Sequence, residues 1–282
     1  MAKYKHFLGL GIAGNFALHL DQAGEAEDFK DVITADEAAP KGMFPFYLPN
    51  ANKAELSAKE ILTTYPLGAD YIRLPKDKTL NIQAEPEVGL VCDLEYSLGI
   101  LSKITPKYFG AYNDFSIRVK GANKISDKKN WGNETKGFSN NIIEIDKFTK
   151  GGNIDNYSIC SFLRRDSEVF AYGEDVELTG YSYFHEKLTD WILNQINVQE
   201  DFGPLEPLSE YIAACNNPQE LIVSIGATRY TEYGESTFLK AGDESIVIVY
   251  DATKLSNKDI LQMVESSSYN NENISVLTQK VI

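Results

Sequence analysis

Two carboxylates stand two residues apart in the stretch Gln83-Ala84-Glu85-Pro86-Glu87-Val88-Gly89-Leu90-Val91. The apolar run that follows is typical of a β-strand, on which alternate side chains point to the same face, so Glu85 and Glu87 are expected to converge. Like charges side by side repel unless a cation lies between them, and a hard, oxygen-seeking metal ion is the candidate. The alternative is a solvated edge strand, which Pro86 favours because it cannot donate to a β-ladder.

Three further residues have types and surroundings that suit the same chemistry. Asp114 lies in a run of apolar and aromatic residues, where an acid is costly to bury unless it is paired or bound to a cation. Lys136 follows a polar, glycine-bearing loop that can present its charge. His19 is expected about one turn into a helix with Asn15 as its N-cap, although a single histidine in such a place is more often packed or solvated than functional.

The composition limits the classes of protein that the chain can belong to. Of its 282 residues, 43% are hydrophobic and 11% aromatic, which is ample for a packed core. The net charge of −14 disfavours nucleic acid and anionic membranes as partners. No apolar stretch approaches the ~20 residues of a membrane helix, and no secretory segment is apparent. The three cysteines are scattered and predict buried thiols, so a soluble cytoplasmic protein is expected.

The hydrophobic pattern predicts a β-rich α+β fold, with strands that form a mixed sandwich or roll and helices packed outside. Strands are predicted at 4–13, 88–96, 108–119, 141–145, 157–164, 168–171, 221–225, 245–250 and 274–281, and an extended segment at 44–49. Helices are predicted at 184–196, 208–214 and 257–265.

The stretch Gly9-x-Gly11-x-x-Gly14 has the formal spacing of a dinucleotide-binding fingerprint. That motif requires a helix and then a second parallel strand, whereas residues 23–41 are acidic and broken. The glycines are therefore expected to allow a turn and close packing of the backbone. Residues 24–42 are predicted to form a mobile loop that closes over a site.

Taken in order, these pieces resemble the motifs of the fumarylacetoacetate hydrolase family. The resemblance covers roughly residues 9 to 251. Its parts are Asn15-Phe16-x-x-His19, Glu85-x-Glu87, Asn113-Asp114-x-Ser116-x-Arg118, Lys136-Gly137-Phe138, Gly226-Ala227-Thr228 and Leu239-x-x-Gly242-Asp243.

The resemblance implies a mixed β-sandwich roll that forms a homodimer and binds a small carboxylate substrate. Residues 1–282 would form a single domain, with 24–42 as a lid and 252–282 as a C-terminal extension. A divalent ion would be held by Glu85, Glu87 and Asp114; such an all-oxygen set suits Mg²⁺, with Mn²⁺ or Ca²⁺ as alternatives.

The resemblance also assigns roles to the remaining motif residues. Lys136 would place a positive charge against the substrate carboxylate or a growing oxyanion, and His19 would be the base that activates water. Ser116, Arg118 and Thr228 would contact substrate, although Arg118 suits a structural ion pair equally well.

The chain departs from the family pattern at the proton-transfer group. Where hydrolase and decarboxylase members have an acid three residues after the histidine, this chain has Gln22, which can orient a water or an imidazole but cannot accept a proton at neutral pH. Ala227 stands at the position of the family's threonine, with Thr228 next to it.

Three functions are compatible with this pattern. The first is a divalent-metal-dependent hydrolase or decarboxylase of small 2-oxo or 1,3-dicarbonyl acids, working through a metal-stabilised enolate. The second is a hydratase or isomerase, which needs the metal and a single acid–base residue. The third is a binding protein that kept the metal site without turnover, for which Gln22 is the cue.

Overall fold

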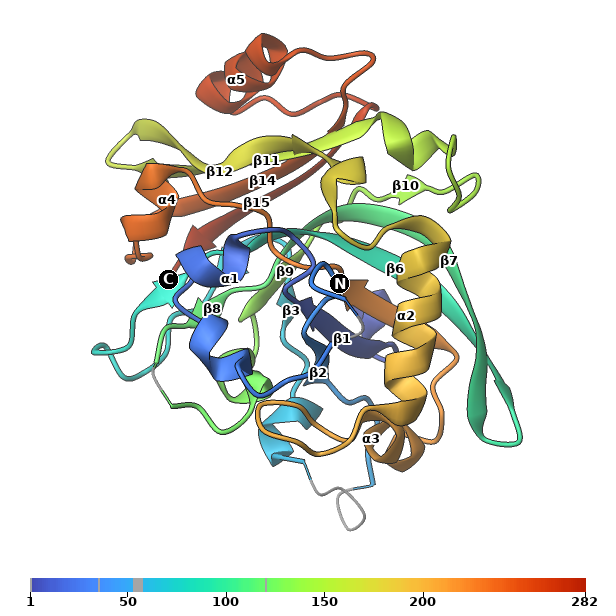
Figure 1. Cartoon of the computed structure of the whole chain (residues 1–282). Helices are drawn as coiled ribbons and strands as arrows, with labels where there is room; N and C mark the ends of the chain where they lie inside the picture. Colours follow the sequence, from blue (N-terminus) through green and yellow to red (C-terminus); the bar gives the residue numbers. More distant parts are fainter. Residues whose placement is uncertain (1, 35, 53–57, 120) are drawn as a thin grey trace.

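The computed structural model describes residues 2–34, 36–52, 58–119 and 121–282. The prediction of a β-rich fold with peripheral helices is confirmed, since two large sheets and a short two-stranded one account for the strands of the described chain (Figure 1). The short sheet joins β5 (Ile82–Gln83) to β8 (Ser116–Ile117), immediately beside the two acidic motifs.

The first sheet contains eight strands among the described residues. Its order is β2 (Gly42–Tyr47), β1 (Leu8–Ala13), β13 (Glu220–Ser224), β6 (Pro86–Ser97), β7 (Ile100–Asn113), β9 (Lys136–Phe138) and β3 (Leu67–Gly68), with β10 (Ile143–Glu144) paired to β7. The long strands β6 and β7 form a hairpin turned by Leu98 and Gly99, which have φ angles of 53° and 80°. Two successive residues with positive φ are the geometry of a tight hairpin turn whose twist matches that of the strands.

The second sheet has the order β12 (Glu168–Glu177), β11 (Tyr157–Arg165), β14 (Glu244–Asp251), β15 (Ile274–Val281) and β4 (Tyr71–Ile72). A shared hydrophobic core joins it to the first sheet, with Leu90 and Val223 from one and Ile159 and Val249 from the other. The segment expected to be a C-terminal extension supplies β15, which pairs with strands on both sides and so belongs to the body of the sheet.

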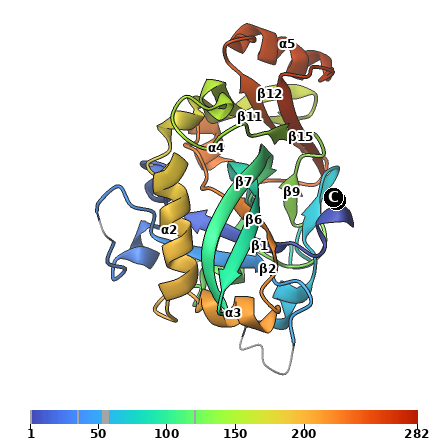
Figure 2. The same ribbon diagram turned by 90° about the vertical axis from the view of Figure 1, so that its right-hand side faces the viewer.

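The helices lie outside the sheets. Figure 2 shows α2 (His185–Val198) beside β6 and β7, and α3 (Leu208–Ala214) lies near its lower end. On the far face of the second sheet lies α5 (Asn257–Ser266), which covers a separate apolar cluster with Ile260 and Val264. The short helices are α1 (His19–Gln22) and α4 (Glu232–Ser236), with 3₁₀ turns at Ala2–Tyr4, Ala26–Phe29, Glu60–Thr63, Ile125–Lys128, Asn153–Asn156 and Leu178–Gly180. No described helix has the length and apolar character needed to cross a membrane.

The glycine-rich stretch at 9–14 does not form a dinucleotide-binding unit, because β1 is followed by the antiparallel strand β2. Close packing explains two of the glycines. A Cβ at Gly9 would lie 2.3 Å from the Phe46 ring, and a Cβ at Gly11 would lie 2.3 Å from the Phe44 ring. The prediction that these glycines allow close backbone approach is confirmed.

Gly11→Ala is expected to lower the free energy of unfolding by about 1–3 kcal/mol, because the new methyl group forces the buried Phe44 ring to move. Urea denaturation measures this change. Gly180→Ala is the matched control, since a Cβ there meets Phe16 at an ordinary 3.5 Å. Equal stability of the two variants would contradict the packing explanation.

Candidate metal centre

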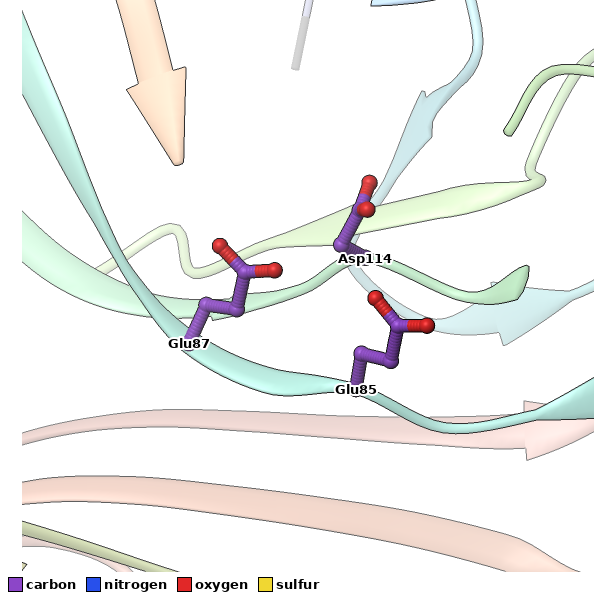
Figure 3. Close-up of side chains that lie close together, drawn as sticks. All are labelled: Glu85, Glu87 and Asp114. Atoms are coloured by element: carbon purple, nitrogen blue, oxygen red, sulfur yellow. The ribbon is translucent and has the colours of Figure 1, made fainter. Parts of the chain in front are cut away.

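Three buried acids converge at one end of the β6–β7 hairpin. The backbone N–H of Asp114 donates to the Glu85 carbonyl at 2.9 Å, and Glu87 pairs with Tyr112 in the ladder. This register places Asp114 across from Glu85 and sends all three carboxylates to the same side, as Figure 3 shows. One oxygen from each lies within 4.8 Å of the others, and the exposed fractions are 3% for Glu85, 1% for Glu87 and 0% for Asp114. The convergence expected from the two-residue spacing is therefore present.

Asn113 fixes this arrangement to the second sheet. Its Oδ1 accepts the backbone N–H of Glu85 at 3.0 Å, and its Nδ2 donates to Ser245 Oγ on β14 at 3.0 Å. Since Asn113 is fully buried, these bonds are made without competition from water. The acidic stretch is thus fixed both to the β6–β7 hairpin and to the second sheet.

Two lysine ammonium groups lie among the acids. Lys129 Nζ is 2.5 Å from Glu85 Oε2 and 2.7 Å from Asp114 Oδ2, and Lys136 Nζ is 2.8 Å from Asp114 Oδ1. Burial alone would raise the pKa of Asp114, but Lys129 and Lys136 hold it below its usual value. Burial lowers the pKa of Lys136 to about 8 against the opposing effect of Asp114. Lys136 also donates to the Phe115 carbonyl at 2.8 Å.

Glu87 differs from the other two acids because no ammonium contacts it among the described residues. Its Oε2 accepts the backbone N–H of Gly226 at 2.9 Å. Burial, followed by the charges of Asp114 and Glu85, raises the pKa of Glu87 well above its usual value. Gly226 has φ of 110°, so the turn after β13 that supplies this N–H depends on a glycine.

A second group of charges closes the centre on its outer side. Arg118 Nη2 is 2.8 Å from Glu85 Oε1, and Arg118 Nη1 is 2.6 Å from Glu25 Oε1. The same Glu25 oxygen lies 2.8 Å from Lys128 Nζ, which also contacts Asp28 at 3.2 Å. The predicted loop 24–42, apart from residue 35, is thus anchored here through the buried Glu25. Arg118 forms ion pairs within the protein, which is one of the two alternatives that the sequence left open for it.

His19 is buried beside the acids, and its hydrogen bond determines which ring nitrogen carries the proton. Its Nδ1 is 2.9 Å from the Thr228 carbonyl, and because a carbonyl only accepts, Nδ1 carries the proton and Nε2 is the free basic nitrogen. Burial lowers the pKa of His19 to about 4, so the imidazole is neutral at pH 7. The Tyr230 ring packs against it with a centroid distance of 5.1 Å.

Two polar residues near His19, Gln22 and Asn15, bond to the protein backbone. Gln22 does not orient the imidazole: its Oε1 accepts the Tyr230 N–H at 2.9 Å and its Nε2 donates to the Tyr230 carbonyl at 3.2 Å. Asn15 does not cap a helix, because α1 begins at His19 with Leu18 at the N-cap. Asn15 instead bonds to the Ile225 and Tyr183 backbones, which ties β1 to the turn after β13.

The two hydroxyls expected to contact substrate are buried. Thr228 Oγ1 lies 3.5 Å from the Pro86 carbonyl, and it is the Thr228 backbone that orients His19. Ser116 Oγ has no hydrogen-bond partner among the described residues. Contact of these hydroxyls with substrate stays a prediction.

The acids and His19 open onto one small cavity. It is also lined by Glu25, Lys129 and Ala227, and its volume of about 10 Å³ is about enough for a single water molecule. On the other side of Glu25 and Arg118 lies a hollow of about 680 Å³, bordered by Gly24, Asp28 and Val119. Glu25 therefore borders both the small cavity of the centre and a space of ordinary ligand size.

Sequence reasoning missed Lys128 and Lys129. They stand in Asp127-Lys128-Lys129-Asn130, which has the composition of a solvated loop, yet each is only 3% exposed. The 3₁₀ turn Ile125–Lys128 directs both side chains inward. The only available signal was the excess of acids predicted to be buried, which requires more cations than Lys136 and Arg118 supply.

The fold is similar to that of solved proteins, among them one described as a putative fumarylacetoacetate hydrolase family protein, so the resemblance seen in the sequence is confirmed at the level of the fold. A 2-keto-3-deoxy-D-arabinonate dehydratase complexed with magnesium and 2,5-dioxopentanoate matches with a TM-score of 0.52 and 17% identity, over 98% of this chain and 72% of the other. The maleylpyruvate hydrolase from Sphingobium sp. SYK-6 matches with a TM-score of 0.51 and 8% identity, over 98% and 70%. A putative fumarylacetoacetate hydrolase family protein from Yersinia pestis CO92 matches with a TM-score of 0.50 and 12% identity, over 98% and 93%.

The sequence itself belongs to the family described as "Family of unknown function (DUF5718)", which matches residues 25–281. No curated protein matches the sequence.

His19→Gln is expected to make folding less sensitive to acid. Because the pKa of His19 falls from about 6.5 in the unfolded chain to about 4 in the folded one, its neutral form contributes about 3 kcal/mol above pH 6.5 that is lost as the pH falls toward 4. The difference between the unfolding free energies at pH 7 and pH 4.5 measures this contribution. If the variant loses as much unfolding free energy between pH 7 and pH 4.5 as the wild type does, the buried, neutral imidazole is contradicted.

Proposed function

We propose that this protein is a divalent-metal-dependent enzyme that acts on a small 2-oxo or 1,3-dicarbonyl acid. The observation that carries the proposal is the convergence of Glu85, Glu87 and Asp114 on a cavity that also receives the neutral His19. Three carboxylates with space for water or substrate oxygens suit Mg²⁺, and Mn²⁺ fits the same donors. The dehydratase with magnesium and 2,5-dioxopentanoate supports the proposal by its shared fold.

The donor set fits a divalent ion, with one condition. All three ligand oxygens belong to buried acids within 4.8 Å of one another, and Glu87 has no cationic contact among the described residues. The condition concerns the Lys129 ammonium, which contacts two of the three acids, Glu85 and Asp114, in this structure. When bound, the ion would supply positive charge to two substrate oxygens as enolate character develops.

The chain's own residues would hold the substrate and move the proton. Lys136 uses two of its three hydrogens on Asp114 and the Phe115 carbonyl, which leaves one for a substrate carboxylate or oxyanion. His19 Nε2 would take a proton from water or from the substrate carbon, with Nδ1 held by Thr228. Arg118 would receive a substrate carboxylate if Glu25 moved away from it.

Access to the centre requires a change at Glu25. The cavity of about 10 Å³ cannot admit an organic acid, whereas the hollow beyond Glu25 has the volume of a ligand pocket. Movement of the segment that carries Glu25 would join the two spaces. This keeps residues 24–42 as the proposed lid, with the ion pairs of Glu25 to Arg118 and Lys128 as its closing contacts.

C–C hydrolysis or decarboxylation is the first candidate reaction, and hydration or isomerisation is the second. The observation that favours the second is that His19 is oriented by a backbone carbonyl, while Gln22, at the position of the expected acid, is bonded to Tyr230. A single base then has to return the proton that it takes, as a hydratase or isomerase does. The two differ in their products, because only the first breaks a C–C bond.

Glu87→Gln is expected to abolish stabilisation by Mg²⁺ while leaving the metal-free melting temperature close to that of the wild type. The raised pKa of Glu87 favours its neutral form without metal, so the neutral amide is a close replacement and still accepts the Gly226 N–H. Thermal unfolding with and without Mg²⁺ measures both effects, and oxalate should add stability only when Mg²⁺ is present.

The matched control for that variant is Glu206→Gln, which replaces another buried acid of raised pKa that bonds to Ser126 outside the centre. It should keep the full Mg²⁺-dependent shift. An unchanged Mg²⁺ shift in the Glu87 variant would overturn the metal proposal.

His19→Ala is expected to lower turnover of acylpyruvates or oxaloacetate by about 10²–10⁴-fold, because the general base is removed. Product analysis distinguishes C–C cleavage from hydration or isomerisation. The Mg²⁺-dependent melting shift should be retained, since the hydrogen bond of the His19 ring goes to the Thr228 carbonyl and not to one of the three acids. Wild-type rates in this variant would remove His19 from the mechanism.

A further inference from the structure

The Lys129 ammonium lies where a cation shared by the acids would lie. It is within 2.7 Å of oxygens from both Glu85 and Asp114, and its side chain is 4% exposed. Beneath it is the face of the Phe44 ring, with the ring centroid 5.3 Å from Nζ. An aromatic face stabilises an ammonium from the side away from the carboxylates. This side chain is therefore held in a built site for a positive charge.

The charges around the centre leave little room for a second cation. Three buried lysines, Lys128, Lys129 and Lys136, and the largely buried Arg118 surround the acids Glu25, Glu85 and Asp114. A divalent ion would add two positive charges within a few ångströms of Lys129. In a buried region such repulsion is weakly screened, so the two cations cannot share the same pair of oxygens at contact distance.

We propose that Lys129 is an internal occupant of the cation site, and that a divalent ion binds Glu85 and Asp114 only when the Lys129 ammonium withdraws. This inference deepens the proposed function, on whose metal site it rests. Lys129 makes the metal-free centre stable by compensating two buried acids, and it sets the affinity for the ion because its own contacts must first be broken.

A place for the withdrawn ammonium exists nearby. Glu25 attracts Lys129 electrostatically in the closed structure and also lines the small cavity. If Glu25 leaves Arg118 and Lys128 as the lid opens, its carboxylate becomes available to another cation. Metal entry and opening at Glu25 are then linked events in the same cavity.

The variant that tests this inference is Lys129→Met, which keeps a long side chain on Phe44 and removes the charge. The two acids that Lys129 contacts each retain one cation in this variant, because Glu85 still has Arg118 and Asp114 still has Lys136. Lys124→Met is the control: it removes a lysine of the same loop, whose ammonium contacts Asp201 and neither Glu25 nor any of the three acids.

The measurement is Mn²⁺ binding to the full chain, followed by the electron paramagnetic resonance signal of free Mn²⁺. Lys129→Met should bind Mn²⁺ at least about tenfold more tightly than the wild type, because breaking a buried ion pair costs several kcal/mol and each 1.4 kcal/mol is tenfold. Lys124→Met should stay within about threefold of the wild type. The metal-free Lys129 variant should also melt below the wild type and gain more from Mn²⁺.

The outcomes separate this inference from the proposed function. Tighter binding in Lys129→Met alone supports the inference, even if the wild type binds no Mn²⁺, and that result would remove metal dependence from the proposed function. Equal or weaker binding in Lys129→Met overturns the inference, as does an equal gain in Lys124→Met. Absence of Mn²⁺ binding in every variant overturns both.

A second measurement applies to the wild type if Lys129→Met does not fold. In crystals soaked with Mn²⁺, anomalous density between the three acids should coincide with a Lys129 Nζ that has left Glu85 and Asp114. Mn²⁺ at the acids with Lys129 still in contact with both oxygens would overturn the inference.

Discussion

The electrostatic cost of burying Glu85, Glu87 and Asp114 side by side is the constraint on which the surrounding structure depends. Ionised carboxylates are expensive to remove from water, and three together are tolerated only with cations or with protons. Here both solutions occur. Lys129, Lys136 and Arg118 contact Glu85 or Asp114, while burial and the neighbouring charges favour the protonated form of Glu87. The segment with Glu25, the loop with Lys129 and the residue after β8, Arg118, meet where these charges must be compensated.

Much of the fold could be predicted from the sequence where it depends on interactions between residues that are close along the chain. The alternation of side chains on a strand was enough to place Glu85 and Glu87 on one face, and the observed limits of α3 and β15 are those predicted from the sequence. The close approach of β1 to the aromatic strand β2 was signalled by its glycines. These features depend on contacts within an element or with the next one along the chain.

The parts that sequence did not reveal depend on distant contacts. Lys129 is drawn inward by acids that precede it by 15 residues or more, and nothing in its immediate neighbours distinguishes it from a solvated lysine. Asn15 was expected to cap a helix, but its amide is used by Ile225 and Tyr183, far along the chain. In both cases a polar side chain follows the nearest buried partner, and that partner is determined only by the complete fold.

The absence of a side chain at Gly11 affects residues that Gly11 does not contact. Phe44 occupies the space above Gly11, and the same ring lies beneath the ammonium of Lys129. A larger residue at position 11 would push this ring toward the acids, and a different ring position would leave the lysine without its support. Gly11, the Phe44 ring and the Lys129 ammonium are therefore coupled through packing, and the effects of substitutions at these three positions are expected to be non-additive.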